Sequence, residues 1–100
     1  MSEPRVEPGL QPYITMAVDD LSRRLSIEPA SVEVRSASLV SWSDGSFGCP
    51  RPGMRYAQVP SDGSVIELAV DGTIYRYHSG GSRTPFLCEP GSGTPLPRRR

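Results

Sequence analysis

VIELAVDGTIYRYH, residues 65–78, is the stretch that decides the fold of this chain. Two runs rich in β-branched and aromatic residues flank Asp71-Gly72, and this dipeptide between such runs predicts a β-hairpin with a two-residue turn. The turn sets six cross-strand pairs: on one face Val70 with Thr73, Leu68 with Tyr75 and Ile66 with Tyr77, and on the other Ala69 with Ile74, Glu67 with Arg76 and Val65 with His78. One face is then apolar and aromatic and the other carries an opposite-charge pair, so both faces support one register.

Three further strands are predicted around the hairpin. Apolar and polar residues alternate along residues 31–42, with a change of phase that predicts a bulge or bend near Ser36–Ser38. The segment RYAQV, residues 55–59, is predicted to be a strand that reaches the hairpin through a turn at residues 60–63. A last short strand is predicted at residues 85–88.

Residues 14–25 are predicted to form the one helix. Apolar side chains recur there at helical spacing and make a single stripe: Ile14, Ala17, Val18, Leu21 and Leu25. Two acid–arginine pairs four residues apart support the helix: Asp19 with Arg23 and Asp20 with Arg24. Pro29 ends the region, because the residue before a proline avoids helical backbone. We therefore expect an α+β fold, in which one N-terminal helix packs on a curled antiparallel sheet of four to five strands and covers Ile66, Leu68, Tyr75 and Tyr77.

A single domain is expected over residues 13–88, between two tails. Residues 1–12 and 89–100 are rich in proline and poor in apolar residues, so they are predicted to be disordered. The chain starts without the apolar run of a signal peptide. The protein is accordingly expected in the cytoplasm if this is its true start, and outside it if a leader is missing.

The composition argues against a nucleic-acid-binding or membrane-spanning protein. The formal net charge is zero, only Arg98–Arg100 cluster among the arginines, and no apolar run is long enough to cross a bilayer. Lysine and asparagine, which have AT-rich codons, are absent, and this indicates a GC-rich genome. We expect a monomer that carries no cofactor.

WSDGSFGCPRPGM, residues 42–54, is the densest stretch of unusual residues and contains the first of two cysteines. A disulfide between Cys49 and Cys88 would close a loop of about forty residues and stabilise the domain by about 4 kcal/mol in the chain-entropy model. Reduced thiols are the alternative. The stretch is predicted to be a structural corner, pinned by this disulfide and by Trp42. A recognition surface is the second interpretation, with five contact residues: Trp42, Phe47, Arg51, Met54 and Arg55.

Catalytic and metal-binding chemistry find little support in the sequence. Ser46 lies in DGSFG, which departs from the G-x-S-x-G pattern of hydrolases. His78 is the only imidazole, and with Cys49 and Cys88 it would offer three metal ligands at a spacing that matches no zinc finger. The hairpin register places His78 on the face away from the helix. We expect it near solvent, with a pKa close to its ordinary value and with little role in fold or function. No catalytic residue and no metal site are therefore predicted.

Several segments resemble a family of small uncharacterised bacterial proteins: DLSRRLSIEPASVEV, VSWSDGSFGCPRPGMRYAQV, VDGTIYRYHS and FLC. The family pattern is W-x-D-G-S-x-G-C-P-x-P-G-M-x-Y-x-Q, then Y-x-Y-H and a final cysteine, and the resemblance covers about residues 18–88. Members often carry export or lipid-anchor signals, which implies an oxidising setting and favours the disulfide. This chain departs from them by showing no leader. The resemblance implies no activity.

The function expected from the sequence is that of a non-enzymatic small domain, either structural or binding another protein or a cell-envelope component. A protease inhibitor that uses the stiff loop Cys49–Arg51 is the alternative, although Pro52 follows the arginine and trypsin-like enzymes cut such bonds poorly. A hydrolase is the third. Exposed aromatic side chains near Trp42 would indicate binding, and buried ones a structural corner.

Overall fold

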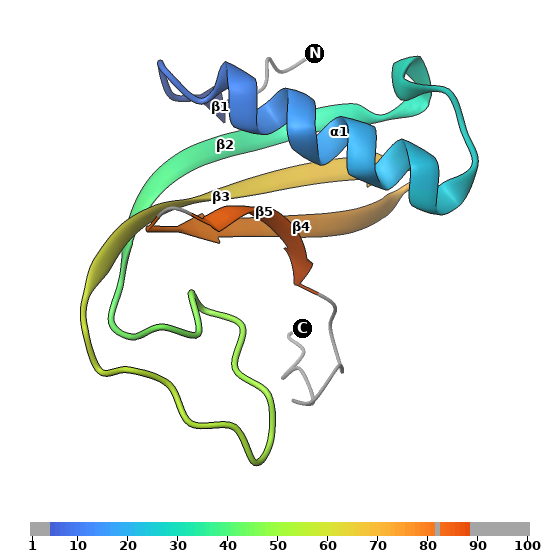
Figure 1. The fold of residues 1–100 in the computed structure, drawn as a ribbon. Helices are drawn as coiled ribbons and strands as arrows, with labels where there is room; N and C mark the ends of the chain where they lie inside the picture. Colours follow the sequence, from blue (N-terminus) through green and yellow to red (C-terminus); the bar gives the residue numbers. More distant parts are fainter. Residues whose placement is uncertain (1–4, 82, 89–100) are drawn as a thin grey trace.

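The computed structural model describes residues 5–81 and 83–88. Its elements in chain order are β1 (Arg5–Val6), α1 (Gln11–Leu25), the 3-10 turn η1 (Pro29–Ser31), β2 (Glu33–Trp42), β3 (Ser61–Val70), β4 (Thr73–Gly80) and β5 (Arg83–Cys88). The strands form one sheet in the order β1-β2-β3-β4-β5, and α1 lies across one of its faces (Figure 1). β1 runs parallel to β2, and all other neighbours are antiparallel. The α+β fold with one helix is confirmed, with a mixed sheet.

The β3–β4 hairpin has the predicted register at every pair from Val65–His78 to Val70–Thr73. Asp71 and Gly72 both have positive φ, 50° and 82°, as the two central residues of a type I′ turn require. Arg76 Nε lies 2.8 Å from Glu67 Oε2, so the predicted opposite-charge pair forms an ion pair. The pair is partly exposed and contributes little to stability, whereas the turn and the apolar face hold the register.

Replacing Gly72 with valine should lower the free energy of unfolding by about 1 to 2 kcal/mol, because a β-branched residue is strained at positive φ. A Cβ at this position would meet no atom within 4 Å, so backbone strain is the whole effect. Urea unfolding measures it. Asparagine tolerates this backbone, so Gly72→Asn serves as the control and should lose much less. Equal stability of the valine variant and the wild type would contradict the turn geometry.

The core lies between α1 and the hairpin face that the sequence assigns to it. Its buried residues are Leu10, Ile14, Ala17, Leu21, Ala37, Ile66, Leu68 and Tyr77, with Tyr75 partly buried against them. The helix ends at Leu25, where Ser26 takes left-handed backbone and its N–H donates to the Arg23 carbonyl. The predicted packing of the helical stripe on Ile66 and Leu68 is confirmed.

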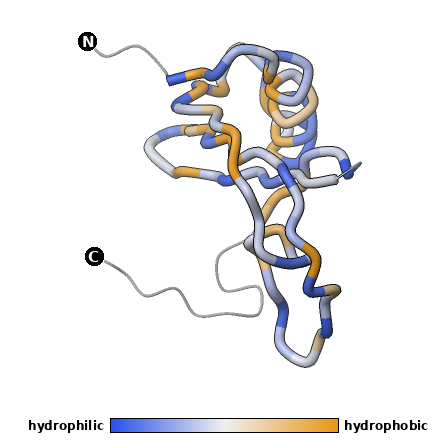
Figure 2. Tube along the Cα trace, turned by 90° about the vertical axis from the view of Figure 1, so that its left-hand side faces the viewer, coloured by the Kyte–Doolittle hydropathy of each residue, from blue (hydrophilic) through white to orange (hydrophobic). Residues whose placement is uncertain are grey.

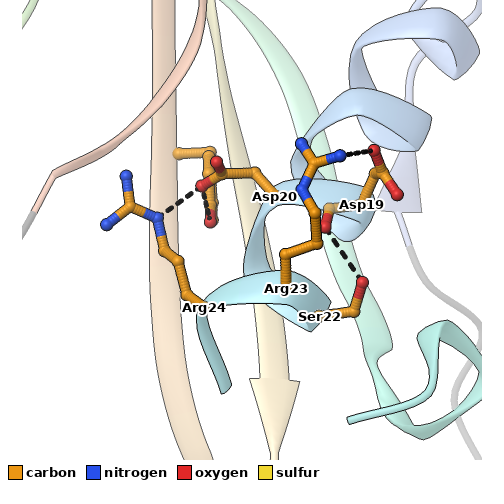
Figure 3. Close-up of polar contacts among 6 residues, drawn as sticks. Asp19, Asp20, Ser22, Arg23 and Arg24 are labelled. Atoms are coloured by element: carbon orange, nitrogen blue, oxygen red, sulfur yellow. Dashed lines mark hydrogen bonds and ion pairs between the residues drawn. The ribbon is translucent and has the colours of Figure 1, made fainter. Parts of the chain in front are cut away.

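A polar link ties the helix to the sheet inside this interface. The hydroxyl of buried Tyr77 donates to Asp20 Oδ2 at 2.7 Å, and the same carboxylate pairs with Arg24 at 2.6 Å (Figure 3). The other predicted pair, Asp19 with Arg23, also forms, at 2.9 Å. Burial raises the pKa of Asp20, but hydrogen bonds from Arg24 and Tyr77 outweigh it and lower this pKa below its ordinary value. Burial and the bond to Asp20 hold the pKa of Tyr77 well above its usual range.

The N-terminal boundary differs from the predicted one. Residues 1–12 were expected to form a disordered tail, but Arg5–Val6 pairs with β2, Leu10 is buried at 2% exposure, and α1 starts at Gln11. Leu10 is the reason, because one apolar side chain entering the core fixes a segment whose composition is otherwise polar. Residues 1–4 and the predicted tail at 89–100 lie outside the described residues.

Two strand predictions are corrected. Residues 55–59 form no strand, and β3 begins at Ser61, inside the predicted turn. The reason is long-range pairing, since the last residues of β2 take Ser61, Asp62 and Gly63 as partners. The register shift of β2 falls between Val34 and Ser36, at the start of the stretch where a bulge was predicted.

Candidate functional site: the loop between β2 and β3

Residues 43–60 connect β2 to β3 and form a long loop that projects away from α1 in two views (Figures 1 and 2). Strand alternation places the side chains at its base. Ile66 and Tyr77 face the helix, so their neighbours Val65 and His78 face the opposite side. The loop folds back against that side, where α1 leaves the sheet uncovered.

The base of the loop is held by three aromatic rings. The Trp42 ring stacks on His78 with centroids 5.0 Å apart and planes 20° apart, and the Phe86 ring makes an edge contact with His78 at a centroid distance of 6.2 Å. Trp42 Nε1 donates to the Ser79 carbonyl at 2.7 Å. His78 Nδ1 lies 2.7 Å from the Phe47 carbonyl and, because a carbonyl only accepts, carries the proton. The three rings and the Trp42 hydrogen bond thus join β2, β4 and β5 at the foot of the loop, and the His78–Phe47 hydrogen bond joins the loop to the sheet.

Three glycines leave room for these rings. A Cβ at Gly48 or Gly63 would collide with the Trp42 indole, and at Gly63 also with the Ser79 carbonyl. A Cβ at Gly80 would lie 2.5 Å from the Phe47 ring. Phe47 has a φ of 53°, which is a strained backbone conformation for phenylalanine. Its contacts with His78 and Gly80 hold it in this conformation. The sequence prediction missed Gly63 and Gly80, whose only signal is glycine within a strand, a mark of close approach by another group.

In the turn after β2, the polar groups of Asp44 and Ser46 form hydrogen bonds with each other. One carboxylate oxygen of Asp44 accepts from the backbone N–H of Ser46 at 2.9 Å and from its hydroxyl at 2.6 Å. These hydrogen bonds lower the pKa of Asp44 below its ordinary value. The Ser46 hydroxyl is therefore a donor inside a turn, and the His78 imidazole forms its hydrogen bond with the Phe47 carbonyl.

A disulfide joins Cys49 of the loop to Cys88 at the end of β5, with Cα atoms 5.9 Å apart. The predicted pairing is confirmed, and the described part of the chain has no free cysteine. The bond ties the loop to the sheet edge opposite β1. It therefore fixes the loop at a second point, beyond the ring contacts.

His78 is the clearest error of the sequence-based account. It was expected near solvent with an ordinary pKa, yet it is only 8% exposed and contacts the rings of both Trp42 and Phe86. Burial lowers its pKa below 6.5, the hydrogen bond to Phe47 opposes this, and Arg76 lowers it further. The predicted partner of His78 across the hairpin, Val65, is confirmed. The loop that covers His78 is distant from it in sequence, so the local pattern could not predict the burial. His78 therefore supports the fold directly.

Stability should fall as pH drops below about 6.5, because the unfolded chain then takes up a proton on His78 that the folded chain resists. The loss should level off once pH passes below the lowered pKa of the folded state. Chemical denaturation between neutral and mildly acidic pH measures this slope. The matched variant His78→Gln should lose less stability over the same interval. Identical slopes for both proteins would contradict the burial of a neutral imidazole.

The tip of the loop is exposed and built on a tight turn. Met54 N donates to the Arg51 carbonyl at 3.2 Å, and Gly53 has a φ of 79°, which with Pro52 at the preceding position matches a type II turn. The Tyr56 hydroxyl accepts from Arg51 N at 3.1 Å and braces this turn. Met54 at this turn is 59% exposed, and Val59, near the start of β3, is 63% exposed.

The five predicted contact residues divide into two groups. Trp42 and Phe47 are half-buried and anchor the base, whereas Arg51, Met54 and Arg55 are exposed at the tip. Val59 was missed, because its neighbours suggested a paired strand. Within residues 5–81 and 83–88, no three metal-ligating side chains gather, and no helix has the length and apolarity to cross a membrane.

One protein family matches a part of the chain that includes the whole loop, residues 43–60. The family described as a domain of unknown function, DUF8738, matches residues 14–88. The chain belongs to this family. The matched part of the DUF8738 domain spans nearly all of α1 and strands β2 to β5, and it includes both cysteines. No curated protein and no solved structure matches the chain. The expected membership in an uncharacterised family is thereby confirmed.

Proposed function

We propose that this domain is a non-enzymatic binding module that presents residues 50–59 to another protein. One observation carries the proposal. The base of the loop is locked by a disulfide, stacked rings and close-packed glycines, while nearly every residue of its tip is exposed. A surface held ready in this way loses little conformational entropy on binding, which favours affinity.

The residue types at the tip support a protein partner. Arginine and methionine are enriched at protein interfaces, and Arg51, Met54 and Arg55 lie at or next to the ends of one turn. Both sequence interpretations of this stretch then apply to different parts of it. Trp42 and Phe47 serve as the structural corner, and the exposed tip serves as the recognition surface.

Enzymatic chemistry has weaker support than binding. The Ser46 hydroxyl and the His78 imidazole both have structural hydrogen bonds, to Asp44 and to Phe47. A protease inhibitor that binds like a substrate would need an extended segment around Arg51. Here Arg51 is instead the first residue of a tight turn. A disulfide is typical of oxidising compartments, which supports a location outside the cytoplasm.

A photo-crosslinking amino acid at Met54 tests the proposal in living cells of the source organism. The matched control carries the same crosslinker at Thr73, exposed beside the hairpin turn at the other end of β3. We expect a discrete adduct with another protein from position 54 only, and its loss on the additional change Arg51→Glu with Arg55→Glu. Adducts that are absent, or the same from both positions, would contradict the proposal. Inhibition of trypsin that disappears in Arg51→Ala would favour the inhibitor instead.

A further inference from the structure

The limb of the loop that returns to β3, residues 55–59, has the sequence of a strand without a strand partner. Its residues are Arg55, Tyr56, Ala57, Gln58 and Val59, a composition that predicts β structure. The structure assigns it neither turn nor helix, and none of its residues has positive φ. Within the described residues, its one backbone–backbone hydrogen bond runs from Gly45 N to the Ala57 carbonyl, at 2.8 Å. The limb is therefore a strand-like segment paired at a single point.

The outer side of this limb is open. In extended backbone, alternate residues point their N–H and C=O groups to opposite sides. Since Ala57 faces Gly45, Tyr56 and Gln58 point their backbone groups away from the rest of the loop. The Gln58 side chain donates to the Tyr56 carbonyl at 3.4 Å, a long contact that an incoming strand can replace.

The outer side of β2, by contrast, is covered. Leu39 N, on the outer edge of β2, donates to the Glu7 carboxylate at 3.2 Å, and β1 pairs beside it. Proteins commonly block exposed strand edges with charges and short added strands. Among the described residues, no added strand and no carboxylate meets the outward backbone groups of residues 55–59; the Gln58 side chain alone contacts one of them, the Tyr56 carbonyl.

The charge of the loop indicates the chemistry of a strand that would fit there. Between Asp44 and Asp62 the chain has two arginines and no acidic residue. Arg51 and Arg55 are both exposed. The aromatic rings of Trp42, Phe47 and Tyr56 are all half-buried rather than presented to a lipid interface. Trp42 and Phe47 pack against glycines at the base of the loop, and the Tyr56 hydroxyl accepts from Arg51 N. An acidic protein segment therefore fits this surface better than a lipid headgroup layer.

We infer that the partner binds as an extended acidic peptide that adds a strand along residues 55–59, an inference that rests on the proposed function. Backbone hydrogen bonds to Tyr56 and Gln58 supply the docking, as in other complexes formed by strand addition. Arg51 and Arg55 select acidic side chains, and Val59 offers an apolar contact at the end of the limb.

Peptides selected from a phage-displayed random library against the oxidised protein, then synthesised, serve as the probe. The central variant is Gln58→Pro, which removes the outward N–H, and its matched control is Gln58→Ala, which keeps that N–H. We expect selected peptides to be acidic, and the proline variant to weaken their binding by about tenfold relative to the alanine variant. Arg55→Glu tests the charge separately and should weaken binding by a similar factor. Near-UV circular dichroism verifies the fold of each variant.

The outcomes separate this inference from the proposed function. Peptides that need Arg51 and Arg55 but bind the proline and alanine variants equally would overturn strand addition and leave a loop-binding function standing. Peptides that bind regardless of every loop variant, or no selected peptide at all, would overturn both. Self-association in analytical ultracentrifugation that Gln58→Pro abolishes would assign the open edge to a second copy and overturn the acidic-peptide inference. Binding to vesicles of anionic phospholipid without any peptide binding would overturn it as well.

Discussion

Removing the Cys49–Cys88 disulfide, by serine at both positions, is expected to lower the free energy of unfolding by about 4 kcal/mol. The bond joins residues 39 apart in sequence, so its loss frees a long closed loop in the unfolded chain. For a small domain this is a large share of the total stability. Guanidinium unfolding under non-reducing conditions measures the difference between the two proteins.

Reduction of the wild type offers the matched control, because it breaks the same bond without changing a residue. Reduced wild type and the double serine variant should show the same midpoint, well below that of the oxidised protein. A midpoint that does not respond to reductant would mean that the disulfide contributes nothing to the fold.

Gly63→Ala is expected to cost about 3 kcal/mol, the upper end of the range for overpacking. The added Cβ would collide with the Trp42 indole and with the Ser79 carbonyl, which accepts the indole hydrogen bond. Relief requires moving either a backbone strand or the ring that anchors the loop. Thermal unfolding and tryptophan fluorescence report the loss, since Trp42 is the only tryptophan.

Gly45→Ala is the control for this substitution. A Cβ at Gly45 has its nearest neighbour, Ala57 N, at 3.5 Å, which is ordinary van der Waals contact. The change should stay within about 0.5 kcal/mol, as for most substitutions away from crowded sites. Equal effects of the two alanine variants would contradict the close packing of Trp42 over Gly63.

The parts of the fold that the sequence predicts well are those set by local rules. The hairpin register depends on Asp71-Gly72 and on the alternation around it, and all its pairs are confirmed. The helix follows from periodicity, and its stripe packs as expected. The start of β3 was missed because Asp62-Gly63 has the composition of a turn. Its pairing with the end of β2 outweighs that local preference.

The candidate site was predictable in part. Its stretch, its disulfide and its exposed arginines follow from the residues themselves. The burial of the aromatic side chains does not follow in the same way, because Trp42 of β2 meets Ser79 and His78 of β4 only when both strands have paired with β3. His78 shows this best, since its strand partner was right while its environment was wrong. The fold-back of the loop is a tertiary event, and no local pattern encodes it.

Backbone ¹⁵N relaxation of the oxidised protein most directly tests the claim that the anchored base holds the loop tip ready for a partner. Residues 50–59 should show order parameters close to those of β3 and β4, about 0.8 or higher. The disulfide, the Trp42–His78 stack and the turn at Arg51–Met54 together require this rigidity. Order parameters below about 0.6 across the tip would show a flexible loop and contradict the account.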